Sequence, residues 1–122
     1  MSQQFQELVA HWKKVGYPSI ESDVEKAFQS IRKDLIACHA RRVPRFSEIL
    51  GDLHLYKYRI KNGAAREGAS GGWRIYALHD LSKGNLYPII IYPKKEWQDA
   101  SNDLVRDAIK EITDALTGTL FG

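Results

Sequence analysis

The sequence has few of the features that mark an extracellular or a membrane protein. It holds one cysteine, Cys38, so no intramolecular disulfide can form and a reducing compartment is expected. Cys38 falls on the apolar side of an expected helix, which favours a small buried hydrophobe over a catalytic thiol. No apolar run approaches the roughly 20 residues that a membrane-spanning helix needs. Residues 1–12 lack the basic head, apolar block and cleavage site of a signal peptide, so we expect a cytoplasmic protein without a membrane partner.

Metal-ligating patterns are also missing. The four histidines are scattered, with no paired spacing and no cysteine or carboxylate cluster beside them: His11, His39, His54 and His79. No Ser/His/Asp or Cys/His arrangement stands out. We therefore expect no metal and no cofactor, and any hydrolytic chemistry would have to run without a metal and without an obvious histidine base.

Charge is unevenly distributed along the 122 residues, a length that suits one domain. Residues 1–40 balance five basic against five acidic side chains. Residues 41–95 carry eleven basic and four acidic side chains, whereas residues 96–122 carry two basic and six acidic ones. The basic middle indicates a surface for a polyanion, although many soluble domains have a basic face that binds nothing.

Helical spacing of apolar residues predicts two helices at the start of the chain and one at its end. The first covers about residues 5–12 and ends at Gly16, and the second begins at a capping box on Ser22, runs past Cys38 and ends before Pro44. The last starts near Ser101, and its expected core stripe is Leu104, Ala108, Ile112 and Leu116. An acidic row four residues apart favours a solvated helix face over a partner site: Asp99, Asp103, Asp107 and Glu111.

Three segments between these helices alternate or are rich in aromatic and branched residues, which predicts strands over 53–61, 73–79 and 86–92. Short connections favour an antiparallel meander with helices against one face. The predicted fold class is therefore α+β: two N-terminal helices, a three-stranded antiparallel sheet and a C-terminal helix.

Alternation along the strands predicts one cationic sheet face that also contains tyrosines. The first strand supplies Lys57, Arg59 and Lys61 to it, the second Arg74 and Tyr76, and the third Tyr92 and Lys94. Such a face suits RNA, because cations hold phosphates while aromatic rings stack on bases, but a plain solvated face has the same composition. The glycines of residues 68–72 favour a hairpin loop over a phosphate cradle.

Three motifs resemble the RelE/HigB branch of the RelE/ParE toxin superfamily. They are the basic strand 58–61, the Ser-Gly-Gly-aromatic-Arg hairpin of residues 70–74 and the Tyr-x-Lys-x-Glu segment 92–96. The resemblance covers about residues 53–118 and implies that residues 1–122 form one RelE-like toxin domain with a microbial ribonuclease-type fold. Many relatives carry a lysine just before Ser-Gly-Gly, where this chain has Ala69, so the resemblance leaves that phosphate contact to Arg66, which is close in sequence.

The resemblance further implies the toxin of a type II toxin–antitoxin pair, a ribosome-dependent mRNA endoribonuclease without a metal. Its partners would be a cognate antitoxin, the ribosome and mRNA, with the toxin alone a monomer and higher-order assembly formed with the antitoxin. The candidate catalytic residues are Arg59, Lys61, Arg74, Tyr92, Lys94 and Glu96. The candidate RNA-binding residues are Arg41, Arg42, Lys57, Arg66, Trp73, Tyr76 and Lys95.

Within these sets Lys61 or Lys94 would act as base or acid, and Arg59 and Arg74 would hold the scissile phosphate. Glu96 would hold Lys94 in place or act as the base itself. Tyr76 or Tyr92 would orient the RNA or stack on it, and Trp73 would offer a further stacking surface. Two other readings stay open. One is a ParE-like toxin that inhibits gyrase and cuts nothing, and the other is a non-enzymatic nucleic-acid-binding module.

Overall fold

The computed structural model describes residues 2–33, 40–44, 46, 53–60, 72–80 and 82–121. Its helices are α1 (Gln3–Lys14), α2 (Ile20–Lys33) and α3 (Asn102–Phe121). Its strands are β1 (Arg41–Arg42), β2 (Leu53–Ile60), β3 (Trp73–Asp80) and β4 (Asn85–Pro93). Within these residues, none of the helices combines the length and the apolar character that crossing a membrane requires.

The first helix forms where the sequence predicts it. The Ser2 Oγ accepts a hydrogen bond of 3.0 Å from the Phe5 N–H, which satisfies one of the free donors at the helix start. Gly16 follows the helix with a φ of 127°, a conformation that glycine adopts without steric cost. The Trp12 indole donates 2.9 Å to the Ile91 carbonyl, and this buried contact ties α1 to β4.

The second helix begins earlier than its expected capping box. It starts at Ile20, so Ser22 lies inside the helix and the predicted cap at that position is wrong. Asp23 is buried, at 6 % exposed. Its Oδ2 accepts 2.9 Å from the Trp73 indole and 3.3 Å from Ser19 Oγ, and the first of these bonds joins α2 to β3. The predicted extension through Cys38 lies outside the described residues.

The sheet is fully antiparallel in the order β1-β2-β3-β4, which confirms the predicted meander but adds a strand. The extra strand is β1, whose Arg41 pairs with Lys57 and whose Arg42 pairs with Tyr56. The sequence patterns assign these two arginines to the end of a helix, which is wrong, because their partner strand gives them extended backbone. The β3–β4 register is shifted between Tyr76 and Ala77.

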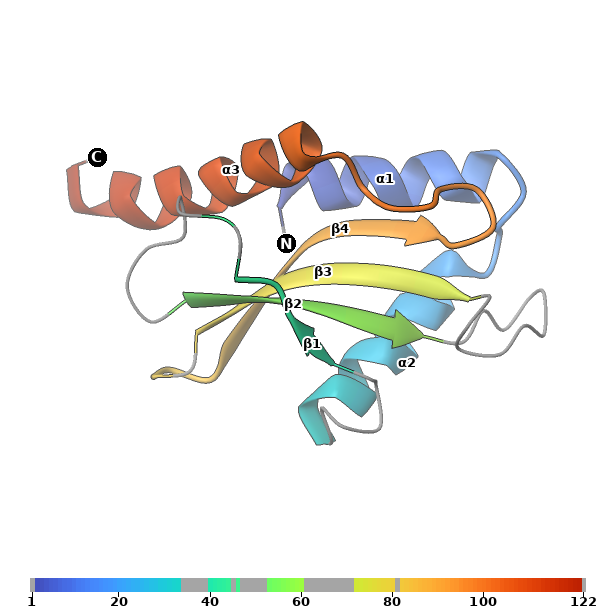
Figure 1. Cartoon of the computed structure of the whole chain (residues 1–122), viewed down its shortest axis with the longest axis horizontal. Coiled ribbons are helices and arrows are strands. Elements are labelled where there is room, and N and C mark those ends of the chain that lie inside the picture. The colour runs from blue at the N-terminus through green and yellow to red at the C-terminus, as the bar shows by residue number, and fades with distance from the viewer. Residues whose placement is uncertain are drawn as a thin grey trace.

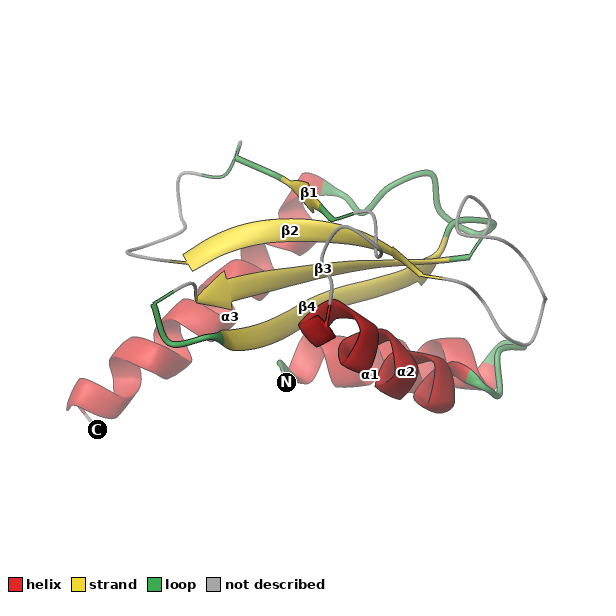
Figure 2. Cartoon of the chain, turned by 90° about the horizontal axis from the view of Figure 1, so that it is seen from below, coloured by secondary structure: helices red, strands yellow, loops and turns green. Residues whose placement is uncertain are grey.

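Helices cover the sheet unevenly. In Figure 1 α2 lies behind the strands, and Figure 2 shows α1 and α2 together on one side of the sheet. The third helix crosses the β4 edge at the other end of the sheet, so the expectation that all helices lie against one face holds only for the first two. Among the described elements, no helix lies over the C-terminal ends of β2 and β4 on the front of the sheet in Figure 1.

The last helix begins where predicted, and of its predicted stripe Ala108 and Ile112 are buried and Leu104 packs against the core. The Ser101 Oγ accepts 3.1 Å from the Leu104 N–H, as an N-terminal cap should. Its buried residues are Val105, Ala108, Ile109 and Ile112. Leu116 is 39 % exposed, so its predicted place in the core is wrong. The acidic row is broken as well, because Asp99 precedes the helix and the Glu111 carboxylate accepts 2.6 Å from the Gln3 N–H of α1.

Candidate functional site

A cavity of about 420 Å³ opens on the front of the sheet, a size within the range of ligand pockets. Its lining residues come from β1, β2, β3 and the segment that leaves β4: Arg41, Lys57, Arg59, Arg74, Lys94, Gln98 and Asp99. Five of these side chains are cationic and one is a carboxylate. The structure thus brings together Arg59, Arg74 and Lys94, which are 35 residues apart in sequence at their extremes.

The strand register explains this convergence. Arg59 pairs with Arg74 across β2 and β3, and Arg74 pairs with Tyr92 across β3 and β4. Residues directly opposite one another in an antiparallel pair project on the same face. The same rule places Arg41 beside Lys57.

Two guanidinium groups therefore lie next to each other in the cavity, and they differ in exposure. Arg59 is exposed, whereas Arg74 is only 5 % exposed and donates 3.4 Å to the Trp73 carbonyl. Burial, followed by the positive charge of Arg59, lowers the pKa of Arg74, and the nearby Tyr92 opposes this effect. Arg74 nevertheless stays cationic at neutral pH because an arginine starts from a very high pKa. A bound anion would relieve the repulsion between the two groups.

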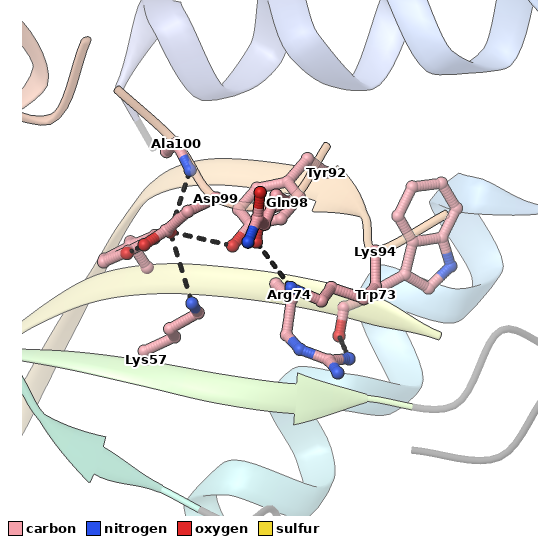
Figure 3. Close-up of polar contacts among 9 residues, drawn as sticks. Lys57, Trp73, Arg74, Tyr92, Lys94, Gln98, Asp99 and Ala100 are labelled. Carbon is pink, nitrogen blue, oxygen red and sulfur yellow. Dashed lines mark hydrogen bonds and ion pairs between the residues drawn. The ribbon is translucent and has the colours of Figure 1, made fainter. Parts of the chain in front are cut away.

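The carboxylate of Asp99 anchors the segment after β4 to the sheet (Figure 3). Its Oδ1 accepts 2.7 Å from the Tyr76 hydroxyl, 3.0 Å from the Tyr92 hydroxyl and 2.8 Å from the Ala100 N–H. The ammonium of Lys57 adds an ion pair of 3.2 Å to the same oxygen. That ammonium also lies 5.4 Å from the ring centroid of Tyr76 and 5.9 Å from that of Tyr92, within cation–π range.

These contacts set the protonation states of the cluster. Burial alone would raise the pKa of Asp99, but hydrogen bonds from Tyr76, the Ala100 N–H, Tyr92 and Lys57 outweigh it and lower the pKa to about 2. Burial and the adjacent Asp99 charge raise the pKa of Tyr92 far above its usual value. At neutral pH the carboxylate is therefore an acceptor without a proton, and Tyr92 is a fixed donor.

The predicted contact between Glu96 and Lys94 is wrong. The Lys94 ammonium donates 2.5 Å to the Gln98 carbonyl, whereas the Glu96 carboxylate accepts 3.1 Å from the Tyr17 hydroxyl. Glu96 is directed towards the end of α1 and is not among the residues that line the cavity. Its predicted role as a base in the same site therefore has no geometric support.

Burial overturns the predicted stacking roles. Trp73 is 1 % exposed and its indole serves the buried bond to Asp23, so it offers no surface to a base. The rings of Tyr76 and Tyr92 are 1 % and 0 % exposed, and their hydroxyls hold Asp99. The prediction that these tyrosines stack directly on bases is wrong, and their role is to position the Asp99 carboxylate.

The other predicted site residues fall outside the cavity or outside the described chain. Arg42 is exposed, and alternation directs it away from Arg41 to the other face of β1. Lys95 is exposed on the turn after β4 and does not line the cavity. Lys61 and Arg66 lie outside the described residues.

Two lining residues, Gln98 and Asp99, are missing from the sequence-based set. The spacing of Asp99 from the later acidic residues assigns it to a helix face, although the helix begins only at Asn102. A local signal did exist: Ser101 is a favoured helix cap, and a residue two positions before a cap lies in the preceding loop. Its tyrosine partners come from β3 and β4, and no short-range pattern predicts that contact.

Among the described residues, no group of three or more histidine, cysteine, aspartate or glutamate side chains is placed to hold a metal ion. In comparisons with known proteins, no family model, no curated protein and no solved structure matches the chain.

Proposed function

We propose that the chain is a RelE/HigB-like toxin with a RelE-like fold, which cleaves mRNA on the ribosome and is held in check by a cognate antitoxin. The observation that supports this proposal is the cavity on the front of the sheet, where five cations from four neighbouring segments surround one ionised carboxylate. A concave cationic site fits a phosphodiester chain, and it coincides with the strands that carry the resemblance.

The proposed reaction is attack of an RNA 2′-hydroxyl oxygen on the adjacent phosphorus. The phosphorus–O5′ bond breaks as the new bond forms, which leaves a 2′,3′-cyclic phosphate and a 5′-hydroxyl. Arg59 and Arg74 bind the phosphate and stabilise the charge that builds on it. A base removes the hydroxyl proton and an acid protonates the departing O5′, and these two roles fall to Lys94 and Lys61.

The test is a cleavage assay on translating ribosomes with a defined mRNA. We expect new mRNA ends that carry a 2′,3′-cyclic phosphate upstream and a 5′-hydroxyl downstream. Arg59→Ala should lower the cleavage rate by about 10²–10³-fold, because one stabilising donor is lost from the transition state. Arg74→Met should do the same while keeping a buried apolar stem of similar length.

Lys110→Ala is the matched control, since Lys110 is exposed on α3 and lies outside the cavity. It removes the same charge and should leave the rate unchanged. An intact mRNA after incubation with the wild-type chain would refute the nuclease proposal, and supercoiling inhibition in its place would favour a ParE-like toxin.

A second candidate, a nucleic-acid-binding module without catalysis, is favoured by one observation. The carboxylate in the cavity has a pKa of about 2, which makes it a weak base at neutral pH. This candidate predicts salt-sensitive binding of free RNA by the same cations, with no new ends on any substrate. Binding that is lost in Arg59→Ala and an absence of cleavage would together select it.

A further inference from the structure

The two oxygens of the Asp99 carboxylate have unequal surroundings. All of its described contacts end on Oδ1, which receives the two tyrosine hydroxyls, the Ala100 N–H and the Lys57 ammonium. Within the described residues Oδ2 receives none. The side chain is 46 % exposed and lines the cavity, so among the contacts of the described residues one oxygen is held by the protein and the other is left for a ligand.

An acceptor of this kind is unexpected in a site for phosphate. A carboxylate repels a phosphate, and five cations would bind one better without it. Hydrogen bonds to a charged acceptor are stronger than those between neutral groups, so Oδ2 is a strong site for a ligand donor. The useful ligand therefore carries an anion and a hydrogen-bond donor close together.

We infer that Asp99 determines sugar specificity, with Oδ2 accepting a hydrogen bond from a ribose 2′-hydroxyl whose neighbouring phosphate lies on Arg59 and Arg74. This inference rests on the proposed function and deepens it. A ribonucleotide places its 2′-hydroxyl beside its 3′-phosphate, whereas DNA has the phosphate alone. The inference concerns recognition and does not require that this hydroxyl is the attacking one.

The rigidity of the cluster supports this role. The carboxylate stays ionised at neutral pH, because its pKa is about 2, and it stays in place because both tyrosines that hold it are buried. An acceptor held in this way loses little entropy when the ligand binds. A purely structural role would explain the contacts to Oδ1, but it would leave binding of RNA and DNA equally affected by a substitution.

The experiment measures binding of three oligonucleotides of one sequence: RNA, the fully 2′-fluoro analogue and DNA. The 2′-fluoro sugar keeps the RNA-like sugar pucker but has no donor, so it isolates the hydrogen bond from the shape. Each is titrated against the wild type, Asp99→Asn and Asp103→Asn, with a gel to show that the RNA remains intact. Asp103 is the matched control, because its side chain is 95 % exposed on α3.

For the wild type we expect RNA to bind about 10–100-fold more tightly than the 2′-fluoro analogue, the range for a hydrogen bond to a charged group. The ratio should fall towards one in Asp99→Asn and stay unchanged in Asp103→Asn. Equal wild-type affinity for RNA and the 2′-fluoro analogue would overturn the inference without needing any variant, and would leave the proposed function standing. Failure to bind any of the three would overturn the inference, whereas the proposed function is tested separately by cleavage on translating ribosomes.

Discussion

Arg59→Gln should make the free protein more stable and the anion-bound protein less so. Arg59 lies directly opposite Arg74, and burial together with the charge of Arg59 lowers the pKa of Arg74. Like charges that face each other on adjacent strands are destabilising, by roughly 0.2–1 kcal/mol. In a domain of this size ~1 kcal/mol shifts the Tm by about 3–6 °C. In chloride buffer, Arg59→Gln should therefore unfold about 1–5 °C above the wild type.

Anions should reverse this order. A ligand present at about 100 times its Kd stabilises the folded state by roughly 2.7 kcal/mol, so inorganic phosphate at saturating concentration should raise the wild-type Tm well above that in chloride of equal ionic strength. Arg59→Gln should lose most of that rise, because one of the two guanidinium groups that hold the anion is gone. The assay is thermal unfolding followed by circular dichroism in the two buffers.

Lys110→Gln is the control for net charge, because it removes one positive charge from an exposed position on α3. It should show no gain in chloride and the full rise in phosphate. A lower Tm for Arg59→Gln in chloride would refute the idea that the two arginines repel each other. An undiminished phosphate response in that variant would refute the placement of the anion between them.

Two further predictions test the polar contacts that hold the site. Trp73→Phe removes the indole donor to the buried Asp23 carboxylate and should lower the free energy of unfolding in urea at pH 7 by about 1–3 kcal/mol. An unchanged free energy of unfolding would show that this hydrogen bond does not stabilise the fold. Asp99 should destabilise the fold on acidification: its pKa is lowered from 3.8 to about 2, so its contribution is complete above about pH 4 and disappears as the pH falls towards 2. Because its side chain is 46 % exposed, solvent screening reduces that contribution to about 1 kcal/mol, and roughly half of it is lost between pH 4 and pH 2.5. Between these two pH values, urea titrations should therefore show Asp99→Asn losing about 0.5 kcal/mol less stability than the wild type.

The sheet could be predicted from sequence because its strands alternate, and alternation is a local property. Once Lys57, Arg59 and Arg74 are assigned to one face of a meander, their proximity follows from the pairing of consecutive strands. The strand β1 could not be predicted, because its backbone is set by contacts that are remote in sequence. Arg41 and Arg42 form a two-residue strand, too short to show alternation, and their extended backbone is set by hydrogen bonding to β2, which is remote in sequence.

The misassigned side chains share a different cause. Tyr92 lies on the cationic face, yet it is buried because the segment after β4 covers it, with the Trp97 ring stacked on it at 5.4 Å. Where that segment packs is not contained in a strand pattern. Trp73 alternates with Arg74 and therefore points to the opposite face of the sheet, where it bonds Asp23 of α2. Lys94 shows the same limit, since its partner is the carbonyl of Gln98 and not the Glu96 side chain that spacing suggests.

The distribution of charge along the sequence also does not show which charged residues line the cavity. Asp99 belongs to the acidic C-terminal stretch, yet the fold places it in a cavity built from the basic middle. The result is a polarised cavity, with paired guanidinium groups on one side and an ionised carboxylate on the other. A bare phosphate satisfies only the first side and is repelled by the second, whereas a ligand with an anion and an adjacent hydroxyl donor satisfies both. Under the recognition proposed above, selectivity for ribonucleotides would require no contact with a base, and it would depend on the tyrosine hydroxyls that keep the carboxylate ionised.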